Sequence, residues 1–199
     1  VEAFNPRTNM WRSCLPLSQR RFGAVAGVVG GRLVVAGGWA DGGGHRTSVE
    51  TYTPTGWTPL PPLPHATAQA SACVLNGRLY VMGGEDCDKL QVLEMSEENE
   101  FSWSIKADLP EDRFDASSTV VGGTCDGPLR SAEVYTGSGW APAPCMPHRA
   151  WGATACVLNG RLYVMGGVDS NKLQGLEMTE ENGLYWSRKA DLPAIRYGE

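Results

Sequence analysis

The sequence predicts an all-β protein built from small repeated antiparallel sheets, and three observations support this fold class. Twenty-five glycines and thirteen prolines in 199 residues suit short strands joined by tight turns. No segment shows sustained helical periodicity. The stretch CVLNGRLYVMGG at 73–84 returns unchanged at 156–167, 83 residues later. The chain therefore contains an internal repeat, and the period of that repeat decides the architecture.

The tryptophans give the length of the repeated unit. Successive separations of 46, 46, 37 and 46 residues join Trp11, Trp57, Trp103, Trp140 and Trp186. The unit is therefore about 45 residues long. The separation of 83 residues between the identical stretches covers two units.

Within each unit the residues predict four antiparallel strands. An apolar run such as FGAVAGVV meets a two-residue turn, which is Gly30-Gly31, Asn76-Gly77 or Asn159-Gly160. Such turns join hairpin strands because both turn residues adopt a positive φ. The second strand ends in a glycine pair, the third contains a glutamate, and the fourth contains the tryptophan. Repeated four-stranded antiparallel units are typical of β-propeller blades.

These features resemble the kelch repeat, in which a glycine pair, a Glu-x-aromatic and a tryptophan recur in this order. The best copy has Gly37-Gly38, Glu50-Thr51-Tyr52 and Trp57, whereas Met95 and Met178 replace the aromatic residue in two other units. The resemblance covers essentially the whole chain. It implies a kelch-type β-propeller of four-stranded antiparallel blades, with about four and a half blades here and an incomplete ring. A complete ring of the family would have five to seven blades, six by resemblance, so we expect the native chain to continue beyond residue 199.

We expect residues 1–199 to form a single partial propeller. Its units are 1–21 (the C-terminal half of a blade), 22–67, 68–113, 114–150, 151–196 and 197–199 (the start of the next blade). The unit 114–150 is nine residues short, because the counterpart of RLVVAGG is absent after Gly123. Either this blade has three strands or a segment between Gly123 and Thr124 is missing from the sequence, as a gap or a recombination-type deletion.

Composition excludes several partners and points to a compartment. A net charge of −5 and a pI near 5.3 argue against nucleic acid as a partner. No apolar run approaches 18 residues, so we expect no membrane insertion. The six cysteines form no CxxC motif, and Cys73 and Cys156 occupy the same place in an apolar strand. We therefore expect a cytoplasmic or other reducing intracellular compartment.

The sequence offers little for catalysis. The histidines, His45, His65 and His148, do not fall at metal-ligand spacing, and no nucleophile motif such as G-x-S-x-G occurs. The resemblance also extends to kelch-fold copper radical oxidases and iron-dependent specifier proteins, but the Glu-x₃-Asp-x₃-His motif of the latter is absent. We predict no catalytic residue, no metal and no cofactor, and keep a metal-dependent enzyme of this fold as an alternative.

The glutamates of the third strands and the repeated tryptophans are interpreted as structural. We expect the glutamates to occupy one repeated strand position and to form hydrogen bonds or ion pairs within each blade, because a buried charge needs a partner. These are Glu2, Glu50, Glu94, Glu133 and Glu177. The tryptophans are expected to pack between blades.

Loops that join a fourth strand to the next first strand share a face with loops between second and third strands. Arg21, Arg113 and Arg196 on that face each precede an aromatic residue, and Arg149 follows His148. In the kelch-like adaptors of ubiquitin ligases that the chain resembles, an arginine at this place lines the binding mouth and pairs with acidic peptides. Alternatively, these arginines bridge to loop aspartates at 41, 86, 126 and 169.

Trp39 directly follows a glycine pair in the longest loop of this face. An exposed aromatic there would anchor a partner, and the alternative is packing on the neighbouring blade. We therefore predict a non-catalytic protein–protein interaction module, an adaptor or scaffold that binds a protein or peptide and can belong to a larger complex. The predicted partner-binding residues are Arg21, Trp39, Arg149, His148, Arg196 and Arg113. The alternative is a structural subunit of a large assembly that makes broad surface contacts.

Overall fold

The computed structural model describes residues 1–110, 130–135, 138–149, 152–158, 161–166, 170–179 and 183–193. Within this part of the chain all regular structure is β, and every strand pair is antiparallel. In the same residues no helix is long and apolar enough to cross a membrane.

Three sheets have four strands each, in sequence order across the sheet. The first contains β3 (Val25–Val29), β4 (Arg32–Ala36), β5 (Val49–Thr53) and β6 (Gly56–Leu60). The second contains β7 (Ser71–Leu75), β8 (Arg78–Met82), β9 (Leu90–Met95) and β10 (Phe101–Ile105). The third contains β13 (Thr154–Leu158), β14 (Arg161–Met165), β15 (Leu173–Thr179) and β16 (Gly183–Arg188).

Two further sheets have two strands each. One pairs β1 (Glu2–Asn5) with β2 (Met10–Ser13), and the other pairs β11 (Ala132–Tyr135) with β12 (Trp140–Ala143). The β11–β12 pair supplies a third and a fourth strand for the short unit. The expected first strand of that unit and the proposed break after Gly123 lie outside the described residues.

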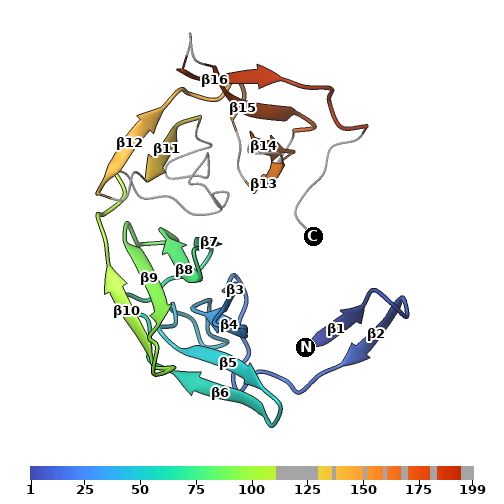
Figure 1. The fold of residues 1–199 in the computed structure, drawn as a ribbon, viewed down its shortest axis with the longest axis vertical. Helices are drawn as coiled ribbons and strands as arrows, with labels where there is room; N and C mark the ends of the chain where they lie inside the picture. Colours follow the sequence, from blue (N-terminus) through green and yellow to red (C-terminus); the bar gives the residue numbers. More distant parts are fainter. Residues whose placement is uncertain are drawn as a thin grey trace.

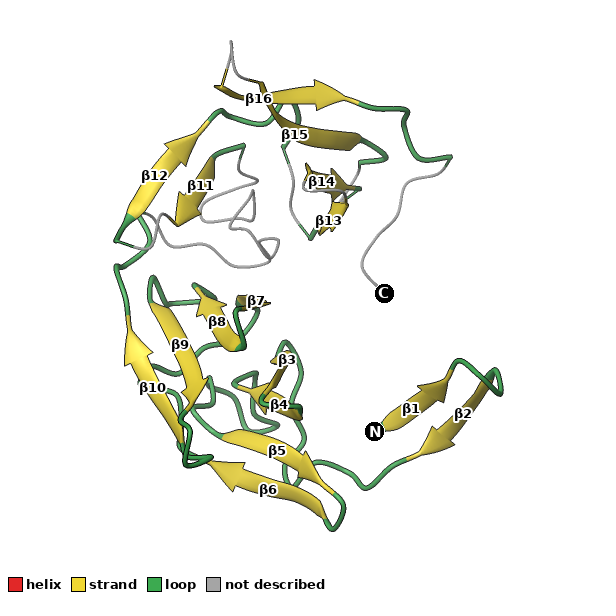
Figure 2. Ribbon diagram, viewed as in Figure 1, coloured by secondary structure: helices red, strands yellow, loops and turns green. Residues whose placement is uncertain are grey.

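The five sheets stand side by side along an open arc around one centre (Figure 1). In each four-stranded sheet the first strand faces the centre and the fourth lies on the outer rim (Figure 2). The predicted fold class, a propeller of four-stranded antiparallel blades with an incomplete ring, is confirmed.

The hairpin turns have the predicted backbone. Gly30 and Gly31 have φ of 57° and 74°, and Asn76 and Gly77 have φ of 49° and 73°. Both residues of each turn thus lie in the left-handed region, as two-residue hairpins of this type require. The third predicted turn, at 159–160, lies outside the described residues.

The hydrophobic core lies between neighbouring sheets. Val29 and Val34 of the first sheet pack with Leu79 and Leu93 of the second, and all four side chains are fully buried. Smaller clusters around Leu90 and Met146 continue this core along the arc. Burial of apolar area between blades therefore holds the arc together.

The repeated tryptophans join each blade to the one before it. For four of the five repeated tryptophans the indole N–H donates to a backbone carbonyl 33 or 42 residues earlier, whereas Trp11 of β2 is 67% exposed. The pairs are Trp57 with Leu15 (2.9 Å), Trp103 with Pro61 (2.9 Å), Trp140 with Ala107 (3.0 Å) and Trp186 with Pro144 (2.7 Å). The predicted packing between blades is confirmed for these four residues.

Met95, which departs from the kelch pattern, fills a specific space between two blades. A Cβ built on Gly30 would lie only 2.1 Å from the Met95 Cε and 2.5 Å from its Sδ. The flexible thioether thus lies directly over a glycine of the neighbouring hairpin turn. Methionine on the third strand and glycine in that turn are therefore matched.

Candidate functional site

The candidate site lies on the face that we call the loop face. It contains the loops that join fourth to first strands and the loops that join second to third strands, because these connections meet at one end of every blade. Six of its residues are predicted to bind a partner, and two of them, Arg113 and Arg196, lie outside the described residues. The structure places the other four as follows.

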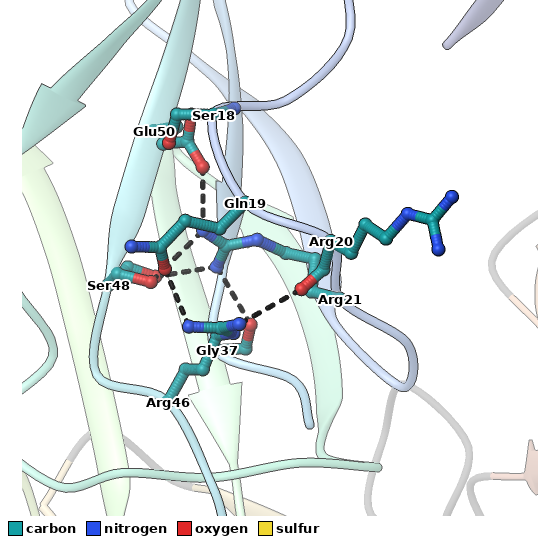
Figure 3. Close-up of polar contacts among 8 residues, drawn as sticks. All are labelled: Ser18, Gln19, Arg20, Arg21, Gly37, Arg46, Ser48 and Glu50. Carbon is teal, nitrogen blue, oxygen red and sulfur yellow. Dashed lines mark hydrogen bonds and ion pairs between the residues drawn. The ribbon is translucent and has the colours of Figure 1, made fainter. Parts of the chain in front are cut away.

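Arg21 does not face solvent. Its side chain is 1% exposed, and its Nη2 lies 2.6 Å from Oε1 of Glu50, which is 4% exposed (Figure 3). Nη1 donates to the backbone oxygens of Gly37 and Ser48, both at 2.8 Å, and Nη2 also donates to the Ser48 hydroxyl at 3.0 Å. The guanidinium thus ties the β2–β3 loop to both ends of the β4–β5 loop.

This geometry argues against direct contact between Arg21 and a partner. Burial alone would raise the pKa of Glu50, but hydrogen bonds from Ser18 and Arg21 outweigh it and leave the pKa below its ordinary value. The carboxylate is therefore charged and neutralises the guanidinium. The alternative of internal pairing fits better, although the acceptor is a strand glutamate and not a loop aspartate.

The strand register corrects the prediction that five glutamates share one position. Glu50 pairs with Pro59 across β5 and β6, and Gln91 pairs with Ile105 across β9 and β10. Pro59 and Ile105 are 46 residues apart, so the structural equivalent of Glu50 is Gln91, and Glu94 lies three residues beyond that position. The same register places Gln174 there in the third sheet, with Glu177 beyond it. The sequence motif aligned Glu94 with Glu50 because it does not account for the β8–β9 loop, which is shorter than the β4–β5 loop and changes which residue reaches this strand position.

Gln91 and Gln174 also hold the loop before the first strand by hydrogen bonds, but their carboxamides are uncharged. Gln91, which is fully buried, accepts from the His65 N–H at 2.8 Å and donates to the His65 carbonyl at 3.1 Å. At the position of Arg21, this blade has Thr67, whose hydroxyl donates to the Gly83 carbonyl at 2.8 Å. An arginine accompanies the glutamate, and a neutral residue accompanies the glutamine.

Trp39 lies in an aromatic stack within its own blade. Its ring is parallel to that of Phe22, with centroids 6.0 Å apart, and meets the His45 ring edge-on at 4.5 Å. The backbone N–H of Trp39 donates to the backbone carbonyl of Phe22 at 2.8 Å. Trp39 is half-buried, whereas Phe22 is 63% exposed. Among the described residues of the loop face, Phe22 is therefore the most exposed aromatic, and the sequence analysis did not select it.

His148 is half-buried, and residues of its own blade bond both its backbone and its ring. Its backbone N–H donates to Gln174 at 2.8 Å, and its Nε2 accepts from the Arg188 Nε at 3.0 Å. Burial, followed by the Arg188 charge, lowers the pKa of His148 below its ordinary value of 6.5. The ring is therefore a neutral acceptor near pH 7.

Arg149 is exposed, and its position in the repeat corresponds to Arg20 and not to Arg21. Arg149 stands three residues before Gly152, as Arg20 stands three before Gly23. The side chain of Arg20 projects away from the buried cluster (Figure 3). Counting back from this glycine would have identified Arg20. The sequence analysis instead looked for an arginine directly before an aromatic residue, and this criterion selected the buried Arg21.

A hollow of about 360 Å³ opens beside Arg20 on the loop face. Pro16, Leu17 and Phe22 contribute apolar walls, and Arg20 and Asp41 add charges of opposite sign. Pockets that bind ligands combine apolar walls with a few polar groups in this way. Among the described residues, no group of three or more His, Cys, Asp or Glu side chains is placed to hold a metal ion.

Comparison with known proteins agrees with this architecture. The kelch motif matches residues 152–178. Human Kelch-like protein 23 is 27% identical over 98% of this chain and 37% of its own length. Kelch-like protein 35 of mouse is 28% identical over 86% and 31%, and Kelch repeat protein M-T8 of Myxoma virus is 28% identical over 96% and 39%. The chain thus spans less than two fifths of the length of these relatives.

A solved structure, "Structure of YjhT", has the same fold with a TM-score of 0.76. The match covers 92% of this chain and 74% of that chain. The sequence identity is 14%, so this likeness concerns the fold alone.

Proposed function

The chain is a kelch-repeat β-propeller, and from this premise we propose that it is a non-catalytic module that binds a protein or peptide through its loop face. The observation that carries the proposal is the exposed ring of Phe22, supported by Trp39 and flanked by the projecting side chain of Arg20. Exposed aromatic residues and arginines are the residues most often found at the energetic centre of protein interfaces.

The proposal revises the set of contact residues. Phe22, Arg20 and Arg149 provide the accessible groups, whereas Arg21 and His148 hold the loops in place. The half-buried ring of Trp39 stacks against the ring of Phe22 and holds it in place. Arg113 and Arg196 stay predictions.

A structural subunit with broad contacts is the second candidate. Val74 and Leu75, at the opposite end of the second blade, are 43% and 56% exposed. Apolar residues at both ends of the blades would suit a scaffold with partners on two faces. The proposed compartment is a reducing one, supported by the free thiols of Cys14, Cys73, Cys87 and Cys145.

Site-specific photo-cross-linking distinguishes the two candidates. A photoreactive phenylalanine replaces Phe22 on the loop face or Leu75 at the opposite end, which are similarly exposed. A loop-face module should cross-link to partner proteins from position 22 and not from position 75. Equal cross-linking from both positions would favour the scaffold, and failure at position 22 would overturn the proposal.

A further inference from the structure

We propose that residues 58–64, on the outer rim of the first four-stranded blade, form a polyproline ligand for a partner domain of the SH3 type. The segment reads TPLPPLP and contains the end of β6 and the start of the connection to β7. β6 is the last strand of its sheet and lies on the outer rim (Figure 2). The inference goes beyond the proposed function, which concerns Phe22, Arg20 and Arg149.

The exposure of this segment repeats every three residues. Leu60 is half-buried and Leu63 is 2% exposed, and both pack into the core between the first and second four-stranded blades. The other residues of the segment are all exposed, namely Thr58, Pro59, Pro61, Pro62 and Pro64. A polyproline II helix has three residues per turn. The two leucines therefore lie on one face of such a helix, and the prolines form its other two faces.

The composition of the segment also restricts its backbone. Each proline ring holds φ at about −65°, and a residue that precedes a proline is biased toward extended conformations. Thr58, Leu60, Pro61 and Leu63 all precede a proline. Within residues 58–64, which the structure describes in full, no φ is positive and no peptide bond is cis. A partner therefore meets the prolines in an extended chain that is already ordered, and binding costs little conformational entropy.

The contacts that hold this segment to the propeller recur in the second four-stranded blade. The N–H of Leu63 donates to the carbonyl of Thr47 at 2.8 Å. Leu109, 46 residues later, is also buried, and its N–H donates to the carbonyl of Asp88 at 2.7 Å. A buried leucine and its hydrogen bond therefore anchor the segment in both blades.

The pairs of exposed prolines, in contrast, are not part of this shared framework. In the second four-stranded blade, residues 104–110 read SIKADLP, so Ile105 and Asp108 stand where the first has Pro59 and Pro62. The outer strands β10 and β16 contain no proline, so protection of a sheet edge does not require one there. The same fold forms without Pro59 and Pro62, and these rings are available to a partner.

The spacing of the prolines indicates the kind of partner. Pro59 and Pro62 form one PxxP pair, and Pro61 and Pro64 form a second. Segments of this spacing in the polyproline II conformation dock onto aromatic-lined grooves, as in SH3 domains. A groove that embraces such a helix contacts two of its three faces, and here the two proline faces are exposed. Residues 58–64 carry no charged side chain, so the contact consists mainly of proline rings packed on aromatic rings.

The test measures binding of the full-length protein to an array of purified SH3 domains, with WW and EVH1 domains on the same array. At least one SH3 domain should bind, and its dissociation constant should rise by at least about tenfold in Pro59→Ile/Pro62→Asp. This variant removes one proline face and carries the residues of the second four-stranded blade. The matched control is Pro142→Ala, because Pro142 of β12 is exposed and has Cys145, not a proline, three residues later.

Every outcome decides the inference. A synthetic peptide of residues 57–65 should compete for the bound SH3 domain, and urea unfolding verifies that each variant folds. The absence of any SH3 binder, unchanged binding of Pro59→Ile/Pro62→Asp, or an equal loss in Pro142→Ala would overturn it. Binding by WW or EVH1 domains alone would overturn the assignment to an SH3 domain. Cross-linking from position 22 is measured separately, so the proposed function does not depend on this result.

Discussion

The pairing of Arg21 with Glu50 makes a quantitative prediction about stability. Both side chains are almost completely buried, at 1% and 4% exposure. Removal of one partner from a buried ion pair costs about 3–5 kcal/mol, because the other charge is left without compensation. We therefore expect Arg21→Thr or Glu50→Gln alone to lower the free energy of unfolding by this amount. The midpoint of thermal unfolding should fall by about 6–20 °C for a chain of this size.

The double variant Arg21→Thr/Glu50→Gln should lose much less than the sum of the single losses. It reproduces the neutral arrangement of Thr67 and Gln91 in the neighbouring blade, where a hydroxyl and a carboxamide bond the corresponding loop. We expect a coupling energy of about 2–3 kcal/mol from a double-mutant cycle. The assay is urea unfolding of the full-length protein followed by tryptophan fluorescence.

Two controls sharpen the cycle. Arg78→Thr breaks the ion pair with Glu94, in which Arg78 is 53% exposed, and should cost under about 1 kcal/mol. Because the pKa of Glu50 is lowered in the folded state, its contribution is present above pH 4.5 and is lost as pH falls through the folded pKa. In Glu50→Gln, the free energy of unfolding should therefore lose this contribution to its decrease at acidic pH. Additive single losses, with no coupling energy in the cycle, would refute the neutral-exchange reasoning.

Three further predictions concern packing and protonation. Gly30→Asn should lower stability by about 0.5–1.5 kcal/mol in urea unfolding, since its Cβ would force the flexible Met95 thioether out of its rotamer; Gly31→Asn, with open space, is the control. Trp103→Phe should cost about 0.5–1.5 kcal/mol in the same assay by removing one hydrogen bond between blades, and no loss would argue against its role. Because the folded-state pKa of His148 is lowered, stability should fall as pH drops through 6.5. NMR titration should show this pKa rise in Arg188→Gln, and an unchanged value would contradict the contact.

Much of the architecture follows from local sequence. Two-residue turns need residues that tolerate a positive φ, so Asn76-Gly77 predicted a hairpin without any tertiary information. The tryptophan spacing revealed the repeat, because four of the five indoles bond the blade before their own. The strand order was accessible for the same reason, since consecutive antiparallel strands joined by short loops pair with their sequence neighbours.

The exposure of the site residues was not accessible from the sequence. Arg20 and Arg21 are neighbours with the same side chain, yet one projects from the surface and the other is enclosed. Their difference depends on Glu50, which lies 29 residues away in sequence and reaches Arg21 only when β5 stands next to the β2–β3 loop. No local pattern contains that contact.

The sequence by itself therefore determined the repeat, the strand order and the turns, because each depends on residues close together in the chain. Only the tertiary structure decided which glutamate or glutamine holds each loop, since loop length shifts the strand register without changing the motif. It also decided that Phe22 and Arg20, and not Arg21, form the accessible surface. Burial and charge compensation depend on segments that meet only after folding, and these segments select the residues that a partner can contact.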